Sequence, residues 1–552
     1  MAPSANSPYS TSSPPTPRSK ILIPETVSPD GLALLSPHFE IHHPKSLSAA
    51  DLLAQISGYD ALIIRSETKV TAEVLATATL LKVVARAGVG VDNVDVDIAT
   101  IYGIIVVNSP SGNIVAAAEH TIALLMAVAR NVPGGDRSLR NGEWERSKLV
   151  GTEVGVGLGM KVVAMDPYAS PEIAASASAK LVGSLGELLP IVDFLTIHTP
   201  LIASTLNLVG TEELKLMKKT AKVLNVARGG VYNEQALFEA LEAGTIAGAG
   251  LDVFTSEPPA PGSAAEALCR HEKVVATPHL GASTVEAQEN VSMDVCAQVL
   301  SILQGGLPTS AVNAPLILPE EYRKLQPFVR LVEKMGELYT QHFSRKGSGQ
   351  GSVGGKTFEL VYEGELASIS NTRPLFAALV KGLTSSFSES GGRDVNIVNA
   401  TLIAKEKGIG INETHNRESK DLVYASLVRL RTGGAEGQVI EGSVSANGIF
   451  ISRLDRFNTS FVPEGTLIVL HNYDEPGKIG EVGSILGRAG INIRFMSVAA
   501  LDNAVCESEE VVEKGRNEAL MILGIEGPAV GKEVENELRA QGGILDVSVV
   551  KL

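Results

Sequence analysis

The sequence predicts an α/β protein with two doubly wound parallel-sheet lobes, followed by an α+β domain and a C-terminal ferredoxin-like domain. Its 552 residues correspond to about three to five domains at roughly 100–200 residues each. Short apolar runs alternate with helical stretches from residue 20 to about residue 305, as expected of parallel strands covered on both faces. The segment from residue 466 has the order strand, helix, strand, strand, helix, strand, which is the ferredoxin-like plan.

The composition restricts the classes of function. Lys and Arg number 47 against 62 Asp and Glu, so the net charge is −15 and neither nucleic acid nor an anionic membrane is an expected partner. No apolar run of about 18 residues is present, which argues against a membrane span. The three cysteines, Cys269, Cys296 and Cys506, are far apart and odd in number. We therefore predict no disulfide framework and no metal site, and we expect a reducing, cytoplasmic compartment.

The first residues differ from the rest of the chain. Residues 1–18 are rich in Ser and Pro and contain no acidic residue, which predicts a disordered tail. A transit peptide is the alternative, supported only by Arg18, and the tail has no apolar core of the kind that a secretory signal needs.

The first lobe is predicted from four short apolar strands, at residues 21–23, 61–64, 82–86 and 104–108. The clearest helix follows at residues 113–130, where Ala and Leu dominate after a polar start. The second lobe is predicted from a further series of strands, at residues 161–165, 194–198, 222–226, 247–254 and 273–277. The two lobes are therefore joined near residues 108–113.

Three residues with catalytic chemistry follow strand ends in the second lobe. Arg228, Glu257 and His279 come after the strands at 222–226, 247–254 and 273–277. Taken singly, they could be a surface charge, a turn residue before Pro-Pro and a structural histidine. Sites in open parallel sheets form beyond the carboxyl ends of the strands, so three such residues at corresponding ends favour a common site.

The three residue types suit one reaction. An arginine can hold an α-carboxylate with two parallel N–H groups, and a histidine can move a proton at physiological pH. A glutamate paired with that histidine favours the imidazolium form and fixes the orientation of the ring.

At this point the sequence resembles a known family. The motifs shared with NAD-dependent D-2-hydroxyacid dehydrogenases are NVARGG, GLDVFTSEPP and TPHLGAST. Three more, RAGVGVDNVDV, VVNSPSGNIVAAAEHT and WERSKLVGTE, narrow the resemblance to the D-3-phosphoglycerate dehydrogenase family, over residues 20–552. The resemblance implies NAD as cofactor, 3-phosphoglycerate as substrate in the first step of serine biosynthesis, L-serine as effector, and a homotetramer.

The resemblance also implies a domain plan. It comprises a flavodoxin-like substrate lobe at residues 19–109 and 304–320, an incomplete Rossmann lobe for NAD at 110–303, an intervening regulatory domain at 321–462, and an ACT domain at 465–552.

Site residues follow from the same resemblance. Arg228 binds the substrate carboxylate and polarises the reacting oxygen, His279 is the acid/base, and Glu257 is its partner. The residues implied on the NAD side are Asp166, Thr199, Val226, Ala227, Arg228, Asp252, His279, Leu280, Gly281 and Ala282. Those implied around the substrate are Arg65, Arg86, Asn108 and Arg146.

Two of these assignments have structural alternatives. Asp166 resembles the acidic residue that binds the adenine ribose and selects NAD over NADP, but it could instead be a turn residue before Pro167. Arg86 could pair structurally rather than bind substrate.

Regulatory residues are implied in the C-terminal domain. Asp474 and Asn492 match the two positions at which ACT domains bind serine, although Asp474 could instead cap the next helix. Arg453 and Arg456 could form an anion site in the intervening domain, or a solvated basic turn.

One departure from the family pattern concerns the phosphate-binding loop. Only residues 154–160 separate Glu153 from the strand that begins at Lys161. A crossover with its helix needs at least about 10–12 residues, so the usual strand, G-x-G-x-x-G loop and helix do not fit. Gly155, Gly157 and Gly159 have the wrong spacing for such a loop, and no strand precedes them and no helix follows them. Roughly twenty residues of the unit are therefore expected to be missing through a clean internal loss, such as a skipped or mis-predicted exon.

Three functions remain open at this stage. The first is NAD-dependent oxidation of phosphoglycerate with serine feedback. The second is a related dehydrogenase, such as one reducing 2-oxoglutarate. The third is a non-catalytic chain that senses a ligand or oligomerises but cannot hold NAD.

Overall fold

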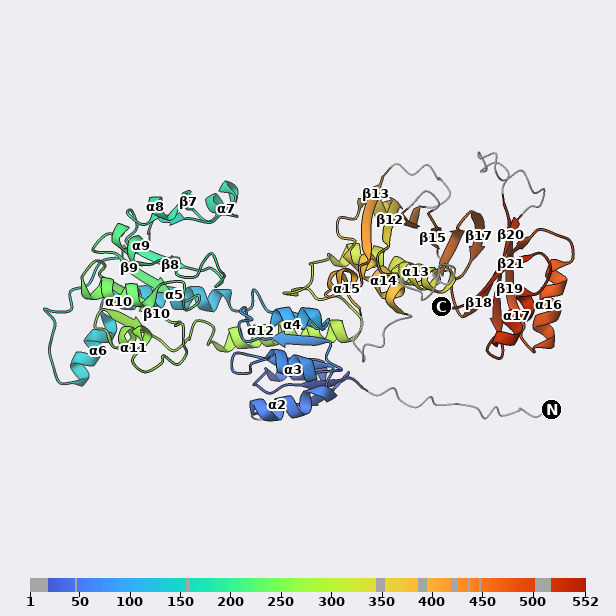
Figure 1. The fold of residues 1–552 in the computed structure, drawn as a ribbon. Helices are drawn as coiled ribbons and strands as arrows, with labels where there is room; N and C mark the ends of the chain where they lie inside the picture. Colours follow the sequence, from blue (N-terminus) through green and yellow to red (C-terminus); the bar gives the residue numbers. More distant parts are fainter. Residues whose placement is uncertain are drawn as a thin grey trace, which may run out of the picture.

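The computed structural model describes residues 18–44, 47–154, 159–343, 353–385, 395–417, 425–433, 437–445, 448–501 and 518–552. Of the tail expected at residues 1–18, only Arg18 lies within the described residues. Cys506 lies outside them, and so do Gly155 and Gly157 of the glycine run before Lys161. Figure 1 shows the regions along the chain, from the blue first lobe to the red C-terminal domain.

The first lobe is a five-stranded parallel sheet in the order β2-β1-β3-β4-β5. Its strands are β1 (Lys20–Leu22), β2 (Glu40–His42), β3 (Ala61–Ile64), β4 (Val83–Arg86) and β5 (Ile105–Asn108). The helices are α1 (Pro29–Leu35), α2 (Ala49–Gln55), α3 (Ala72–Thr77) and α4 (Val96–Ile101). Alternate residues of β3 enter different cores, Ile63 on one face and Leu62 on the other, which confirms the doubly covered parallel sheet.

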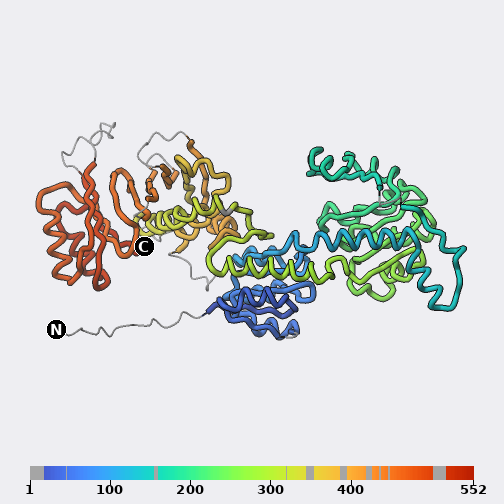
Figure 2. The backbone as a smooth tube through the Cα atoms, turned by 180° about the vertical axis from the view of Figure 1, so that it is seen from behind, coloured from blue at the N-terminus to red at the C-terminus, as the bar shows by residue number. Residues whose placement is uncertain are grey.

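Two long helices connect the lobes. Helix α5 (Ile114–Ala129) packs on the sheet of the second lobe, and α12 (Val285–Leu303) packs on α1 and on the sheet of the first lobe. Figure 2 shows both helices running between the lobes. Residues 285–303 were expected in the second lobe. The structure instead assigns them to the first, because Val291, Val295 and Val299 are buried in the core of that lobe.

The second lobe is built on a four-stranded parallel sheet in the order β11-β10-β9-β8. The strands are β8 (Phe194–Ile197), β9 (Lys222–Asn225), β10 (Gly248–Leu251) and β11 (Val274–Ala276). One face buries a large core against α9 (Thr211–Leu216), α10 (Glu234–Glu242) and α11 (Ala264–Arg270). The opposite face packs on α5 in a much smaller core around Leu124, Leu125 and Leu224.

The sheet of the second lobe is split where the missing unit was expected. After α6 (Val132–Arg140), the next elements are β6 (Val162–Ala164), α7 (Pro171–Ser176), β7 (Ala179–Leu181) and α8 (Leu185–Leu188). Strand β6 pairs with β7 in a separate two-stranded sheet, and within the described residues no strand joins β6 to β8. Figure 1 shows β7 and α7 set apart from the sheet. Among the described residues, the strand expected between β6 and β8 is therefore absent.

The third region is an α+β domain, as expected. Its six-stranded sheet has the order β13-β12-β14-β15-β16-β17, with β12 and β13 parallel and the other pairs antiparallel. The strands are β12 (Thr357–Gly364), β13 (Gly410–Asn416), β14 (Ser426–Thr432), β15 (Val439–Ser445), β16 (Gly448–Leu454) and β17 (Phe457–Phe461). Its helices are α13 (Pro319–His342), α14 (Arg373–Thr384) and α15 (Ala400–Glu406).

The C-terminal domain has the predicted β-α-β-β-α-β order and an antiparallel sheet, β19-β20-β18-β21. Its elements are β18 (Thr466–Tyr473), α16 (Lys478–Arg488), β19 (Asn492–Ala500), β20 (Glu518–Glu526), α17 (Lys532–Arg539) and β21 (Ile544–Lys551). Ile468 and Leu470 face the domain's own helices, whereas Leu467 and Val469 enter the core of the intervening domain. The third and fourth regions therefore share one hydrophobic core.

In the part of the chain that the structure describes, no single helix is long and apolar enough to cross a membrane. Helices α5 and α6, bent by 62° relative to each other, meet the length and composition requirement only as a pair.

Candidate functional site

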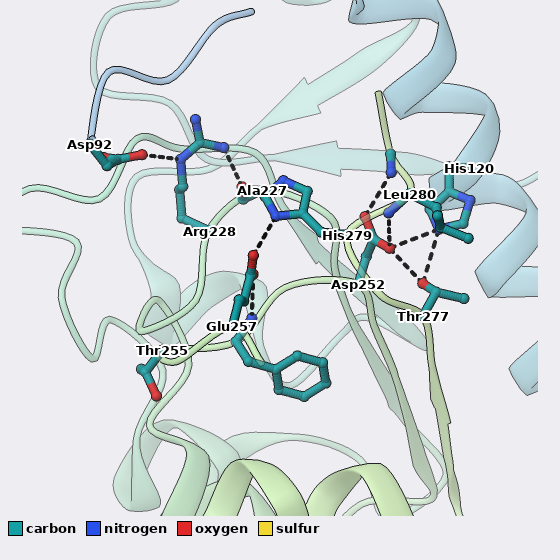
Figure 3. Close-up of polar contacts among 12 residues, drawn as sticks. Asp92, His120, Ala227, Arg228, Asp252, Thr255, Glu257, Thr277, His279 and Leu280 are labelled. Atoms are coloured by element: carbon teal, nitrogen blue, oxygen red, sulfur yellow. Dashed lines mark hydrogen bonds and ion pairs between the residues drawn. The ribbon is translucent and has the colours of Figure 1, made fainter. Parts of the chain in front are cut away.

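The three predicted catalytic residues meet at the carboxyl ends of the strands in the second lobe. Arg228 follows β9, Glu257 follows β10 and His279 follows β11, and parallel pairing brings these ends to one edge of the sheet. Figure 3 shows Glu257 and His279 turned toward each other, with the Arg228 guanidinium directed to Asp92 and to the carbonyl of Ala227. The sequence therefore identified residues that the fold places together.

His279 and Glu257 form a directly bonded pair. His279 Nδ1 lies 2.7 Å from Glu257 Oε2, and the backbone N–H of Phe254 donates to Glu257 Oε1 at 3.0 Å. Burial alone would raise the pKa of Glu257, but these two hydrogen bonds and the charges of His279 and Arg228 outweigh it and lower that pKa. Glu257 is therefore held as a carboxylate that orients the imidazole and leaves Nε2 for a reacting proton.

Arg228 is fixed by its own loop and by the other lobe. Its Nη1 donates to the carbonyl of Ala227 at 2.7 Å, and its Nε donates to Asp92 Oδ2 at 3.0 Å. Buried Asn225 shapes the loop, accepting from the N–H of Ala227 and donating to the carbonyl of Arg228. Asp92 belongs to the segment between β4 and α4 of the first lobe, so this ion pair crosses between the lobes.

Arg86 points into the same region from the end of β4. Burial and the positive charge of Arg228 lower the pKa of Arg86 to about 10, and Arg65 contributes further repulsion. Arg86 Nε is buried without a hydrogen-bond partner among the described residues. A buried guanidinium nitrogen without a hydrogen-bond partner, close to other cations, is a costly arrangement that an anionic ligand would relieve. No hydrogen bond or ion pair of Arg86 is formed among the described residues, although the nearby carboxylates of Asp92 and Glu25 favour its charge.

The other two residues implied around the substrate have different surroundings. Asn108, at the end of β5, donates to the carbonyl of Val89 at 2.6 Å and thereby braces the loop that carries Asp92. Arg146 is exposed in the segment after α6, and in the described part of the chain no hydrogen bond or ion pair links it to Arg65 or Arg86. Its role near the substrate remains a prediction.

Asp252 is the centre of a polar cluster that supports the His279 loop. Its carboxylate accepts from the N–H groups of Leu280 and Gly281 at 2.7 and 2.8 Å and from the hydroxyl of Thr277 at 2.6 Å. His120 Nε2, from helix α5, lies 3.2 Å from the same carboxylate (Figure 3). His120 was not among the predicted site residues. The signal available was a histidine within a helix that is mostly apolar.

The remaining residues implied on the NAD side line the same strand ends. Val226 and Gly281 are buried beside each other, Ala227 and Ala282 are partly exposed, and Leu280 is exposed. Thr199, just beyond β8, has a buried hydroxyl oxygen without a partner among the described residues. Such an orphaned group suits a polar ligand, and the assignment of these residues to the nicotinamide side of NAD stays a prediction.

Asp166 ends the segment that contains β6, as predicted. Its Oδ1 accepts from the N–H groups of Tyr168 and Ala169 at 2.8 and 3.2 Å. The turn that was the alternative explanation is thus present. Only Oδ1 of Asp166 accepts hydrogen bonds in this turn, and no described residue donates a hydrogen bond to Oδ2.

The regulatory residues lie at two exposed positions of the C-terminal domain. Asp474 follows β18 and Asn492 begins β19. The alternative that Asp474 caps α16 is wrong, because the N-cap is Gly477 and no side chain caps the helix. Arg453 pairs with Glu441 and Arg456 pairs with Glu518, so the proposed anion site between these two arginines is not formed.

Comparisons with known proteins show which proteins this chain is similar to. The family model for the NAD binding domain of D-isomer specific 2-hydroxyacid dehydrogenases matches residues 152–281, and that for the D-3-phosphoglycerate dehydrogenase intervening domain matches residues 324–450. A D-3-phosphoglycerate dehydrogenase from Synechocystis sp. is 37% identical, over 97% of this chain and 95% of its own length. One from Methanocaldococcus jannaschii is 36% identical, over 97% of this chain and all of its own. The solved D-lactate dehydrogenase from Aquifex aeolicus, complexed with NAD and lactic acid, is 21% identical over 54% of this chain and 100% of that chain, with a TM-score of 0.49.

Proposed function

Because the chain belongs to the D-3-phosphoglycerate dehydrogenase family, we propose that it oxidises 3-phospho-D-glycerate to 3-phosphohydroxypyruvate with NAD, the first step of L-serine biosynthesis. The observation that carries the proposal is the placement of Arg86 and Arg228 beside the His279–Glu257 pair. A substrate with a carboxylate, a C2 hydroxyl and a phosphate presents one group to each of these features.

The residues of this chain divide the reaction among them. Arg228 holds the carboxylate and orients C2, and His279 takes the proton of the C2 hydroxyl as the carbonyl forms. Glu257 stabilises the imidazolium that results. NAD, when bound, supplies the acceptor for the hydride that leaves C2.

Arg65 and Arg86 supply positive charge for the phosphate. They repel each other, and Arg86 is desolvated, so a phosphate between them gains charge-assisted hydrogen bonds in a partly dry site. An unphosphorylated 2-hydroxy acid offers no such group.

Substrate kinetics test the proposal in a restored chain, defined as this chain with a family-like strand, glycine-rich loop and helix inserted after Val154. We expect 3-phosphoglycerate to be oxidised with a kcat/KM at least about tenfold above that of D-glycerate, and Arg86→Gln to remove most of this difference. Faster reduction of 2-oxoglutarate than of 3-phosphohydroxypyruvate would instead favour the related dehydrogenase.

The split sheet supports a second candidate function for the chain as it stands. A chain without the central strand and its helix lacks the helix N-terminus that binds pyrophosphate, and it could act only as a ligand-sensing or oligomerisation protein. Serine binding without measurable NAD binding would support this candidate.

Feedback by L-serine is the regulatory part of the proposal. Asp474 and Asn492 are exposed polar groups next to the β18–α16 turn and at the start of β19, where a small amino acid could bind between paired C-terminal domains. Titration calorimetry on the full chain should show serine binding, and Asp474→Ala should weaken it at least about fivefold. No heat from serine with the unmodified chain would exclude this effector.

The proposal includes a homo-oligomer, as a tetramer, in the reducing cytoplasm. Helix α5 is apolar on its outer side as well, where Val115, Ile122 and Met126 are 70, 45 and 36% exposed. An apolar stripe of this kind is typical of a contact between subunits. Light scattering should give a multiple of 57.9 kDa, and Ile122→Asp should lower the measured mass.

A further inference from the structure

Two carboxylates, Asp92 and Glu25, act on the arginines proposed to bind the substrate. Asp92 bonds to Arg228 and also contributes a favourable charge interaction to Arg86. Glu25, the other carboxylate acting on Arg86, is occupied by the N–H groups of Arg65, Glu67 and Thr68. Asp92 therefore interacts with both guanidinium groups. Among the described residues, no backbone N–H group donates a hydrogen bond to its carboxylate.

The contact occupies the part of Arg228 that an acid substrate needs. A carboxylate binds arginine at two points only when two parallel N–H groups on one edge are free. Asp92 accepts from Nε, one of the two donors of the Nε–Nη2 edge, and the carbonyl of Ala227 accepts from Nη1. A second carboxylate can make a two-point contact with the Nε–Nη2 edge only after Asp92 leaves.

The backbone of the β4–α4 segment makes this arrangement possible. A Cβ on Gly90 would lie 1.8 Å from Arg228 Nη2 and 3.0 Å from Asp92 Oδ2. A Cβ on Gly88 would lie 1.7 Å from Arg86 Nη1. The two guanidinium groups and the Asp92 carboxylate thus surround a glycine backbone that leaves just enough room for them.

We infer that Asp92 is an internal ligand of Arg228, and that the carboxylate of an acid substrate displaces it on binding. The side chain of Asp92 is 68% exposed, so it can turn into solvent without breaking a buried contact. A neutral compound cannot replace it, because Arg228 would then lose an anion and gain none. Asp92 thereby determines selectivity for acids. The inference rests on the proposed function for the identity of the substrate.

Binding measurements on the chain as written test the displacement. Asp92→Asn removes the competing charge, so calorimetry should show about three- to tenfold tighter binding of 3-phosphoglycerate, the range expected when a partly exposed ion pair no longer has to be broken. Asp97→Asn is the matched control, since Asp97 is exposed in the first turn of α4 and the change in net charge is the same. Weaker binding in Asp92→Asn, or equal changes in both variants, would overturn the inference.

Chemical modification separates this inference from the proposed function. Phenylglyoxal should modify Arg228 at least about threefold faster in Asp92→Asn than in the parent chain, and oxalate should protect Arg228 at a lower concentration in the variant. Peptide mass spectrometry reads both effects. If neither the parent chain nor the variants bind 3-phosphoglycerate but these two effects are present, the proposed substrate is wrong. The inference that Asp92 is a displaceable ligand of Arg228 is then still supported. If neither effect is present, Asp92 is not a displaceable ligand.

Discussion

His279 and Glu257 are close enough to act as one unit, and the role of the histidine can be tested by removing it. His279→Ala in the restored chain should lower turnover at least about a hundredfold, because the C2 hydroxyl would lose its general base. His38→Ala, at an exposed position of the first lobe, is the control and should leave turnover unchanged. Steady-state kinetics distinguish the two, and near-normal turnover of His279→Ala would assign the base to another residue.

The lowered pKa of Glu257 predicts a pH dependence of stability. Hydrogen bonds and nearby positive charge more than offset burial and bring that pKa below its ordinary value of 4.5. The stabilisation is therefore present above about pH 4.5 and is lost as the pH falls through the lowered native value. On acidification the parent chain should lose more unfolding free energy than Glu257→Gln, by less than about 1 kcal/mol because the pair is partly exposed. Urea unfolding at pH 6 and pH 3 measures the difference, and equal losses would contradict it.

At Asp166, the effect of the negative charge can be tested separately from that of the turn that its side chain forms. Asp166→Asn keeps an oxygen that can accept from Tyr168 and Ala169, while it removes the negative charge that would repel a 2′-phosphate. In the restored chain this variant should narrow the preference for NAD over NADP at least about fivefold, with little change in melting temperature. An unchanged preference would reduce Asp166 to a turn residue.

The site could be predicted where chemistry and strand position agree. Arg228, Glu257 and His279 follow three strands in the same sheet, and parallel pairing alone brings them together. Asp92 and His120 could not be found in this way. Each contributes through a contact with a distant segment, Asp92 across the two lobes and His120 from a connecting helix.

At the scale of elements, the strands of the first two lobes that the sequence did not predict have three residues each. Strand β2 consists of Glu40, Ile41 and His42, and it exists through its pairing with β1. Strand β7 has three residues, likewise paired with only one neighbour. Short edge strands carry too little apolar pattern to be recognised, whereas β3 and β9 are continuous buried runs.

The last two domains share a core that bears on how they fold. Leu467, Val469 and Ile522 of the C-terminal domain pack against the intervening domain. His342 on α13 also hydrogen-bonds Ser548 on β21 at 2.6 Å. The isolated segment should therefore melt at least about 10 °C below a fragment of residues 319–552, because it exposes one face of its sheet. Calorimetric scans of both fragments measure this, and equal melting temperatures would show that the shared core adds nothing.

In the whole molecule, the predicted catalytic residues lie together at one edge of the second-lobe sheet, although that sheet is interrupted. Strand β8 ends the four-stranded sheet with Thr196 exposed, and Val162 on β6 is 51% exposed. Free strand edges with apolar neighbours favour association between chains. The catalytic residues come from β9, β10 and β11, on the intact side, which explains why the site forms although the sheet is incomplete.

The missing unit should therefore affect NAD binding and solubility more than the geometry of the catalytic residues. The restored chain should bind NAD at least about tenfold more tightly than the chain as written, since recovering even about 1.4 kcal/mol of contacts to the pyrophosphate gives that factor. It should also give a higher soluble yield, because the inserted strand pairs with both β6 and β8. A chain with a Gly/Ser linker of equal length after Val154 is the control for length. NAD affinity, from fluorescence titration, and soluble yield are compared for the chain as written, the restored chain and the linker control. Equal affinities and equal yields for all three would mean that residues 155–159 already replace the missing strand, loop and helix in function.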